Sequence, residues 1–229
     1  MNFFYVEQDK NSENKEQGLL DYVNGLSAER LARVRGNPRK VLEVIDEYCA
    51  TQNGLNTIGR FKGEIVADYV KQSLPKLTIE IGTYIGYSTI FFANEVFDIC
   101  NYVSFEENEQ HANIARELVK LAGLDDRVEI IVGDVEKSIE TFAQSDPRAE
   151  KGANFVFMSN CDQQMLQTLE NSNLIHKDQT KLAADKTSAE NSQNLLDHIS
   201  NGSYSSTTIP ALDPWGNEDG VCLAKCVNK

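Results

Sequence analysis

The stretch TIEIGTYIGYS, residues Thr78–Ser88, joins a short apolar run to a segment with helical spacing, and it decides the fold. Glycine lets the backbone turn tightly between a strand and a helix, and it lets a ligand approach the bare main chain. Gly82 and Gly86 are four residues apart, whereas dinucleotide-binding loops read G-x-G-x-x-G and P-loops end in G-K-[ST]. The glycine turn therefore fits either a simple connection between strand and helix or a ligand-binding loop. Its spacing disfavours NAD, FAD and a P-loop.

Strands and helices alternate from this stretch onward. Short apolar runs predict strands at Leu77–Ile81, Tyr102–Phe105, Val128–Val132 and Asn154–Met158. Helical spacing separates them at Tyr87–Val96, Asn108–Ala122, Val135–Ala143 and Gln163–Glu170. This alternation predicts an α/β fold with a mostly parallel sheet. Nearer the C-terminus, Asn201–Gly220 is rich in Ser, Thr, Pro and Gly and is expected to be a loop, and Gly220–Val227 is expected to be a last, antiparallel strand.

The first third of the chain predicts helices without strands. Apolar residues recur at helical spacing in Gly18–Arg35, Pro38–Thr51 and Lys62–Lys71. No long linker interrupts the chain, so we predict one domain over residues 1–229, with a flexible arm at 1–17, a helical cap at 18–75 and a sheet core at 76–229.

The charge and the apolar content exclude several partners. The chain has 229 residues, with 22 Lys and Arg against 35 Asp and Glu, a net charge of −13. Nucleic acids and anionic membranes need clustered basic residues, so neither partner is expected. No apolar stretch approaches the roughly 20 residues of a membrane span, and residues 1–17 do not resemble a secretory signal. Five scattered cysteines favour reduced thiols, and we expect a cytoplasmic protein.

Two acidic positions follow the strands next to the glycine turn. Glu106 ends the second strand, where a carboxylate can accept hydrogen bonds from ribose hydroxyls. Gly133-Asp134 follows the third strand, where an adenine base would lie. Singly, each also fits a solvated strand end, but their order and spacing favour an adenosine cofactor without phosphates, namely S-adenosylmethionine.

Longer stretches carry a specific resemblance. They are Lys15-Glu16-Gln17, VLEVIDEYC at Val41–Cys49, Lys62-Gly63, EIGTYIGYS at Glu80–Ser88 and Leu121-Ala122-Gly123-Leu124. On these motifs, from about Lys15 to about Asp185, the chain resembles the catechol O-methyltransferase family. The resemblance implies a doubly wound, Rossmann-like sheet of seven strands with the last strand antiparallel. It also implies an S-adenosylmethionine-dependent methyltransferase acting on a small molecule, with S-adenosylhomocysteine as product.

The same resemblance implies the residues that contact the cofactor. Glu80, Gly82 and Tyr84 would frame the methionine end and Ser88 would hold its carboxylate, while Ile58 would offer a backbone contact. Glu106 would take the ribose hydroxyls, and Asp134 and Glu136 would lie beside the adenine, next to Gly133.

Of the family's magnesium ligands, two aspartates and one asparagine, only Asp185 is retained. Ser159-Asn160 stands where the first aspartate is expected, Asp185-Lys186 replaces Asp-Asn, and Asp162 occupies the place of the family's lysine base. Because Mg²⁺ prefers carboxylates and other hard oxygen ligands, we assign no metal ligand and expect metal-independent chemistry. We hypothesise that Lys186 replaces the metal by pairing with Asp185, against the alternative of a decayed site with a solvated pair.

Several alternatives remain open from the sequence. The acceptor is expected to be a phenolic hydroxyl or an amine, handled by Ser159, Asn160, Asp162, Asp185 and Lys186. A non-methylating enzyme, or a catalytically silent cofactor-binding protein, would fit the same fold. The N-terminal helices could form a homodimer interface. Trp215 could be a lid or a loop anchor, of which the anchor is favoured, and His111 is expected on a solvent-facing helix side.

Overall fold

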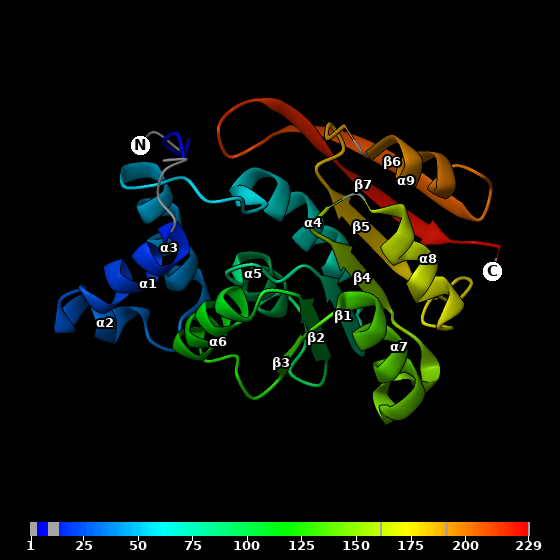
Figure 1. Ribbon diagram of the computed structural model, residues 1–229, viewed down its shortest axis with the longest axis horizontal. Coiled ribbons are helices and arrows are strands. Elements are labelled where there is room, and N and C mark those ends of the chain that lie inside the picture. Colours follow the sequence, from blue (N-terminus) through cyan, green and yellow to red (C-terminus); the bar gives the residue numbers. More distant parts are fainter. Residues whose placement is uncertain (1–3, 9–13, 161, 191, 229) are drawn as a thin grey trace.

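The computed structural model describes residues 4–8, 14–160, 162–190 and 192–228. Within these residues, seven strands form one sheet in the order β3-β2-β1-β4-β5-β7-β6 (Figure 1). The strands are β1 Leu77–Ile81, β2 Asn101–Glu106, β3 Val128–Val132, β4 Phe155–Met158, β5 Lys181–Asp185, β6 Tyr204–Leu212 and β7 Glu218–Cys226. Strands β1 to β5 are parallel, and β7 is antiparallel to both neighbours. The predicted α/β sheet, with its antiparallel last strand, is confirmed.

Helices cover both faces of this sheet. They are α1 Lys15–Asn24, α2 Ala28–Val34, α3 Pro38–Thr51, α4 Gly59–Ser73, α5 Tyr87–Ala93, α6 Glu109–Ala122, α7 Val135–Ser145, α8 Gln163–Asn171 and α9 Ser192–Ile199, with a 3₁₀ turn at Pro147–Lys151. Adjacent residues of β4 show why both faces are covered. Phe157 packs into the core under α3 to α6, whereas Val156 packs into the core under α7 to α9. Side chains alternate along a strand, so a strand that is apolar at every position needs a cover on each side.

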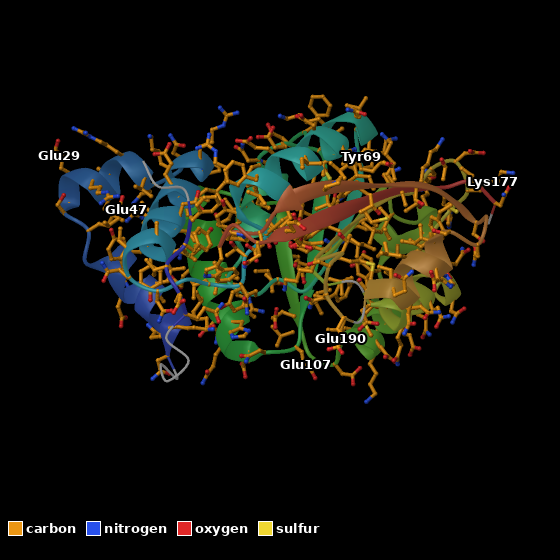
Figure 2. The ribbon with its side chains drawn as sticks, turned by 90° about the horizontal axis from the view of Figure 1, so that it is seen from above. Glu29, Glu47, Tyr69, Glu107, Lys177 and Glu190 are labelled. Carbon is orange, nitrogen blue, oxygen red and sulfur yellow. The ribbon has the colours of Figure 1, made fainter. Side chains whose placement is uncertain are left out.

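The N-terminal helices extend the molecule at one end. Glu29 and Glu47 mark this cap, and Lys177 marks the opposite end, in the view from above (Figure 2). The glycine turn lies between them, because β1 is near the middle of the sheet. None of the helices in the described part of the chain is both long and apolar enough to cross a membrane.

The expected loop at Asn201–Gly220 is wrong. Strand β6 and the start of β7 occupy most of it and form a hairpin that turns at residues 213–217. Edge strands tolerate polar residues and proline because one side of the backbone has no partner strand to satisfy. Pro210 lies in such an edge strand, opposite Gly220. The Ser, Thr and Pro content therefore reflects an exposed edge.

The segment predicted to be a solvated arm is packed where the structure describes it. Tyr5 is buried, and its amide donates to the carbonyl of Pro214 at 2.9 Å. The indole nitrogen of Trp215 donates to the carbonyl of Val6 at 3.0 Å, and its ring meets Tyr5 edge to face. The hairpin tip therefore fastens the N-terminal segment, which makes Trp215 a loop anchor.

Candidate active site

A cavity of about 580 Å³ opens at the carboxyl ends of the parallel strands. Open α/β sheets bind ligands there, because helices leave neighbouring strands toward opposite faces and a crevice remains. The predicted site residues that line it are Ile58, Gly82, Tyr84, Ser88, Glu106, Asp134, Glu136, Ser159, Asn160, Asp162, Asp185 and Lys186. Glu80 and Gly133 are not among the residues that line the cavity.

The glycine turn shapes the centre of this cavity. Gly82, Tyr84 and Gly86 all have positive φ angles, of 89°, 50° and 82°. A β-carbon on Gly82 would lie 2.1 Å from the hydroxyl oxygen of Ser159, so no larger residue fits at this position. Glycine at this position lets Ser159, which follows β4, lie close to the backbone of the turn, and Gly82 itself lines the cavity.

Glu106 lies at the tip of β2, with its carboxylate held by the main chain. Its Oε2 accepts the amide of Tyr84 at 2.7 Å, and its Oε1 accepts the amide of Asn108 at 2.9 Å. A carboxylate offers about four acceptor positions, so these two bonds leave capacity for a hydroxyl-bearing ligand.

His111 is a lining residue that the sequence did not reveal. Its ring meets that of Tyr84 edge to face, with centroids 4.9 Å apart, and its Nδ1 lies 3.8 Å from Glu106 Oε1. It is half-buried, contrary to the expected solvent-facing position. The first turn of α6 returns over the end of β2, a tertiary contact that the helical spacing alone does not indicate.

Glu80 lies behind the cavity in a cage of hydroxyl groups. Ser88 donates to its Oε1 at 2.6 Å, while Thr89 and Ser104 donate to its Oε2 at 2.6 and 2.8 Å. Burial raises the pKa of Glu80 to about 7, although these hydrogen bonds lower it. The arrangement ties β1, β2 and α5 together. It also commits the Ser88 hydrogen to Glu80, so this hydroxyl cannot donate to a ligand carboxylate in the same geometry.

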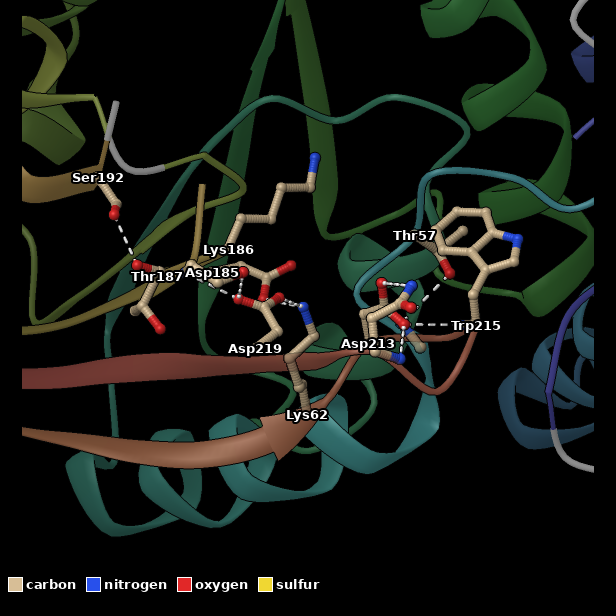
Figure 3. Close-up of polar contacts among 12 residues, drawn as sticks. Thr57, Lys62, Asp185, Lys186, Thr187, Ser192, Asp213, Trp215 and Asp219 are labelled. Atoms are coloured by element: carbon tan, nitrogen blue, oxygen red, sulfur yellow. Dashed lines mark hydrogen bonds and ion pairs between the residues drawn. The ribbon is translucent and has the colours of Figure 1, made fainter. Parts of the chain in front are cut away.

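A buried ammonium group lies behind the cavity, next to the end of β5. Lys62 of α4, which is 1% exposed, places its Nζ 2.6 Å from Asp185 Oδ1 and 2.5 Å from Asp219 Oδ2 (Figure 3). Burial alone would lower the pKa of Lys62, but the two carboxylates outweigh it and raise the pKa. Burial raises the pKa of Asp185 to about 6, against the lowering effect of Lys62. Ser188 also donates to Asp219, through its amide and its hydroxyl.

The expected ion pair between Asp185 and Lys186 is wrong. Asp185 pairs with Lys62, whereas the Nζ of Lys186 donates to Asn160 Oδ1 at 2.9 Å. Successive side chains leave a strand on opposite sides, and Lys186 also takes a positive φ of 61°. Its side chain consequently extends away from Lys62 (Figure 3).

The remaining predicted residues have partners of their own. Ser159 donates its hydroxyl to the carbonyl of Ile81 at 3.0 Å. Asp162 caps α8, since its Oδ1 accepts the amides of Gln164 and Met165 at 2.8 and 3.3 Å. No group of three or more His, Cys, Asp or Glu that could hold a metal ion occurs in the described ranges.

Replacing Lys62 by Met should destabilise the protein strongly. Two buried carboxylates would lose their counter-charge, which costs about 3–5 kcal/mol. Urea unfolding would measure the loss against Lys40→Met, which removes an exposed ammonium paired with Glu43 and should change stability little. The triple variant Lys62→Met/Asp185→Asn/Asp219→Asn should recover part of the loss. Equal stability of Lys62→Met and wild type would contradict the assignment.

Glu80 should make stability fall as the pH rises from about 5 to about 7.5. Its folded pKa of about 7 lies above its ordinary value of 4.5, so the native state holds a proton that the unfolded state releases in this window. The stabilisation is complete below about pH 4.5 and is lost as the pH passes about 7. Urea unfolding should show that wild type loses about 2.5 kcal/mol more unfolding free energy than Glu80→Gln between pH 5.0 and pH 7.5. The exposed variant Glu140→Gln should keep the wild-type difference; an unchanged difference in Glu80→Gln would refute this account.

Comparisons with known proteins show the family to which the chain is similar. Residues 37–188 match the model of a family described as O-methyltransferase. Mouse catechol O-methyltransferase is 32% identical over 119 residues, which cover 52% of this chain and 43% of that protein. Zebrafish catechol O-methyltransferase B is 32% identical over 108 residues, covering 47% and 41%. The matched region therefore spans less than half the length of these curated relatives.

Solved structures support the fold. The O-methyltransferase from Bacillus cereus, in complex with S-adenosylhomocysteine, superposes with a TM-score of 0.65 at 21% identity, over 92% of this chain and 96% of that one. A caffeoyl-CoA O-methyltransferase homologue from Staphylococcus aureus gives the same TM-score at 17% identity, over 93% and 99%. Since the family match covers well over half of the chain and includes the glycine turn and the ends of β1 to β5, the chain belongs to the O-methyltransferase family.

Proposed function

We propose that this protein is an S-adenosylmethionine-dependent methyltransferase that methylates a phenolic hydroxyl or an amine of a small molecule without a divalent metal ion. The observation that carries the proposal is the Glu106 carboxylate, fixed by two backbone amides beside the glycine turn. That geometry suits the two hydroxyls of a ribose, and the turn lacks the spacing for a pyrophosphate.

The lining residues provide for the rest of such a cofactor. Asp134 and Glu136 lie where the adenine of an adenosine would end, and Gly133 shapes the backbone before them. Ile58, Gly82 and Tyr84 border the methionine end, and Tyr84 donates its hydroxyl to Glu16 of the cap. Glu80 and Ser88 act together as a support beneath the turn. Bound there, the cofactor would supply a sulfonium methyl group, which passes to the acceptor as the acceptor gives up its proton.

Asp185 is our candidate for the group that accepts this proton. It lines the cavity, and a pKa of about 6 suits a base that works near neutral pH. Lys62 supports it electrostatically from the buried side. Lys186 and Asn160 line the cavity as a hydrogen-bonded pair, placed to bind an acceptor oxygen as negative charge develops on it. Ser159 and Asp162 shape this end of the cavity through their backbone partners.

The residues at the family's metal position do not suit Mg²⁺. Ser159 replaces a carboxylate and gives its hydrogen to Ile81, and Asp185 already contacts an ammonium group. Lys186 adds a second cation at the same strand end. Magnesium requires about six hard oxygen ligands at about 2.1 Å, which this set does not offer. We therefore propose that acceptor positioning and a fixed cation replace metal coordination.

Glu106→Gln should bind S-adenosylhomocysteine about tenfold to a hundredfold more weakly than wild type, because the variant loses charge-assisted acceptors for the ribose hydroxyls. Calorimetry would measure the dissociation constants. Glu109→Gln, three residues further on at an exposed position, is the matched control and should keep wild-type affinity. Equal affinity of all three proteins would show the ribose assignment to be wrong.

Transfer of label from methyl-labelled S-adenosylmethionine to a panel of phenols and amines tests the reaction itself. Wild type should label at least one acceptor, and Asp185→Asn should lose most of that rate. Tight cofactor binding without transfer to any acceptor would favour a non-methylating enzyme or a catalytically silent cofactor-binding protein.

A further inference from the structure

A second hollow of about 660 Å³ adjoins the outer end of the cavity. Five carboxamide side chains line it: Asn160 after β4, Gln163, Gln164 and Gln167 on α8, and Asn194 on α9. We call it the carboxamide trough. Asn160, Asp162 and Lys186 line both the trough and the cavity, so one ligand can occupy the two together.

The α8 side of the trough follows from helical geometry. Gln163 and Gln167 are four residues apart and Gln164 and Gln167 are three apart, so all three share one face. Leu166 and Leu169 on the opposite face are buried and fix the rotation of the helix. The capping bonds of Asp162 hold the first turn at the boundary with the cavity.

Gln164 links the two hollows directly. Its Nε2 donates to Oε1 of Glu136, which lines the main cavity. The trough is therefore built onto the wall of the cavity and continues it outward from the acceptor end.

The chemistry of the trough differs from that of the cavity. Phe157 and Met165 give the cavity apolar walls, suited to an aromatic ring. Among the described residues that line the trough none is aromatic, and the charged ones, Asp162 and Lys186, have opposite signs. This balance disfavours a phosphate-bearing group, which needs clustered basic residues. Carboxamides both donate and accept hydrogen bonds without net charge, as alcohol hydroxyls do.

We propose that the acceptor is an aryl glycoside, whose phenolic ring enters the cavity and whose neutral, polyhydroxylated sugar occupies the carboxamide trough. This inference rests on the proposed function for the identity of the reacting hydroxyl. The trough itself predicts a sugar-binding subsite whether or not methyl transfer occurs.

Two probes with one free phenolic hydroxyl each test the subsite. They are 4-hydroxyphenyl β-glucoside and 4-methoxyphenol, which differ in the group on the para oxygen, glucosyl or methyl. Calorimetry in the presence of S-adenosylhomocysteine measures binding without requiring turnover. The glucoside should bind about tenfold or more tightly, because each hydrogen bond from a carboxamide contributes roughly threefold to tenfold in affinity.

Variants of residues that line the trough test whether the trough causes the higher affinity for the glucoside. Gln167→Ala/Asn194→Ala should reduce the advantage of the glucoside to about twofold and leave the affinity for 4-methoxyphenol unchanged. Gln193→Ala is the matched control, because this exposed residue of α9 bonds Asp197 and does not line the trough. Equal or undetectable binding of the glucoside, or an advantage that survives the double variant, would overturn the inference.

The same probes separate this inference from the proposed function. Preferred binding of the glucoside without label transfer to either probe would support the trough and count against methyl transfer. Transfer of label to both probes with equal kcat/KM and equal affinity would support methyl transfer and overturn the trough.

Discussion

The Lys62 ammonium, buried between the carboxylates of Asp185 and Asp219, is the interaction on which the β5 end of the cavity depends. It joins α4 of the cap side to β5 and β7, three elements that are distant in the sequence. A buried charge is tolerated only when it is paired and hydrogen-bonded. The three groups consequently hold one another in place, and the strand end that carries Asp185 is fixed relative to the helix.

This arrangement determines the charge around the end of β5. The Asp185 carboxylate, at a position where the resemblance implies one of the family's magnesium ligands, contacts an ammonium group that is covalently part of the chain. An ammonium group does not dissociate as a metal ion does, so the local charge stays constant. Burial keeps the pKa of Asp185 above its ordinary value. The side chain of Lys186 extends away from Lys62, and its ammonium group donates to Asn160. Both features fit a site in which the chain supplies the cation and the base.

Local patterns predict β1 to β4 but not the interior strand β5, and most of the residues that line the cavity are indicated by the family resemblance and not by local pattern. The run at Leu77–Ile81 marks a strand that is buried at every position, the β-branched run at Val128–Val132 marks the edge strand β3, and the glycine turn marks the ligand edge. Strand β6 was missed because its side chains are largely exposed and its definition comes from pairing with β7. The burial of Tyr5 is not predictable from local sequence for a similar reason. Its hydrogen-bond partners, Pro214 and Asp46, lie in distant parts of the chain, as does Cys49, the partner of Val6.

Most residues that line the cavity could be named from the sequence, but the hydrogen-bond and ion-pair partners of their side chains could not. Twelve of the residues that the resemblance indicates line the cavity, whereas Glu80 and Gly133 do not. Adjacency in the sequence suggests that Asp185 pairs with Lys186, but the two side chains have different partners. Their separation follows from the alternation of side chains at a strand end, and the true partner of Asp185 lies on α4. Lys62 appeared only as part of a motif, because nothing in its local sequence shows that it is buried. His111 likewise becomes a lining residue only once α6 is packed over β2.

The most direct test of this account is a calorimetric titration of Mg²⁺ into the protein with S-adenosylhomocysteine present. With Lys62 occupying the carboxylate of Asp185, the account predicts no saturable binding at millimolar Mg²⁺. A stoichiometric magnesium site of micromolar affinity that disappears in Asp185→Asn would contradict it.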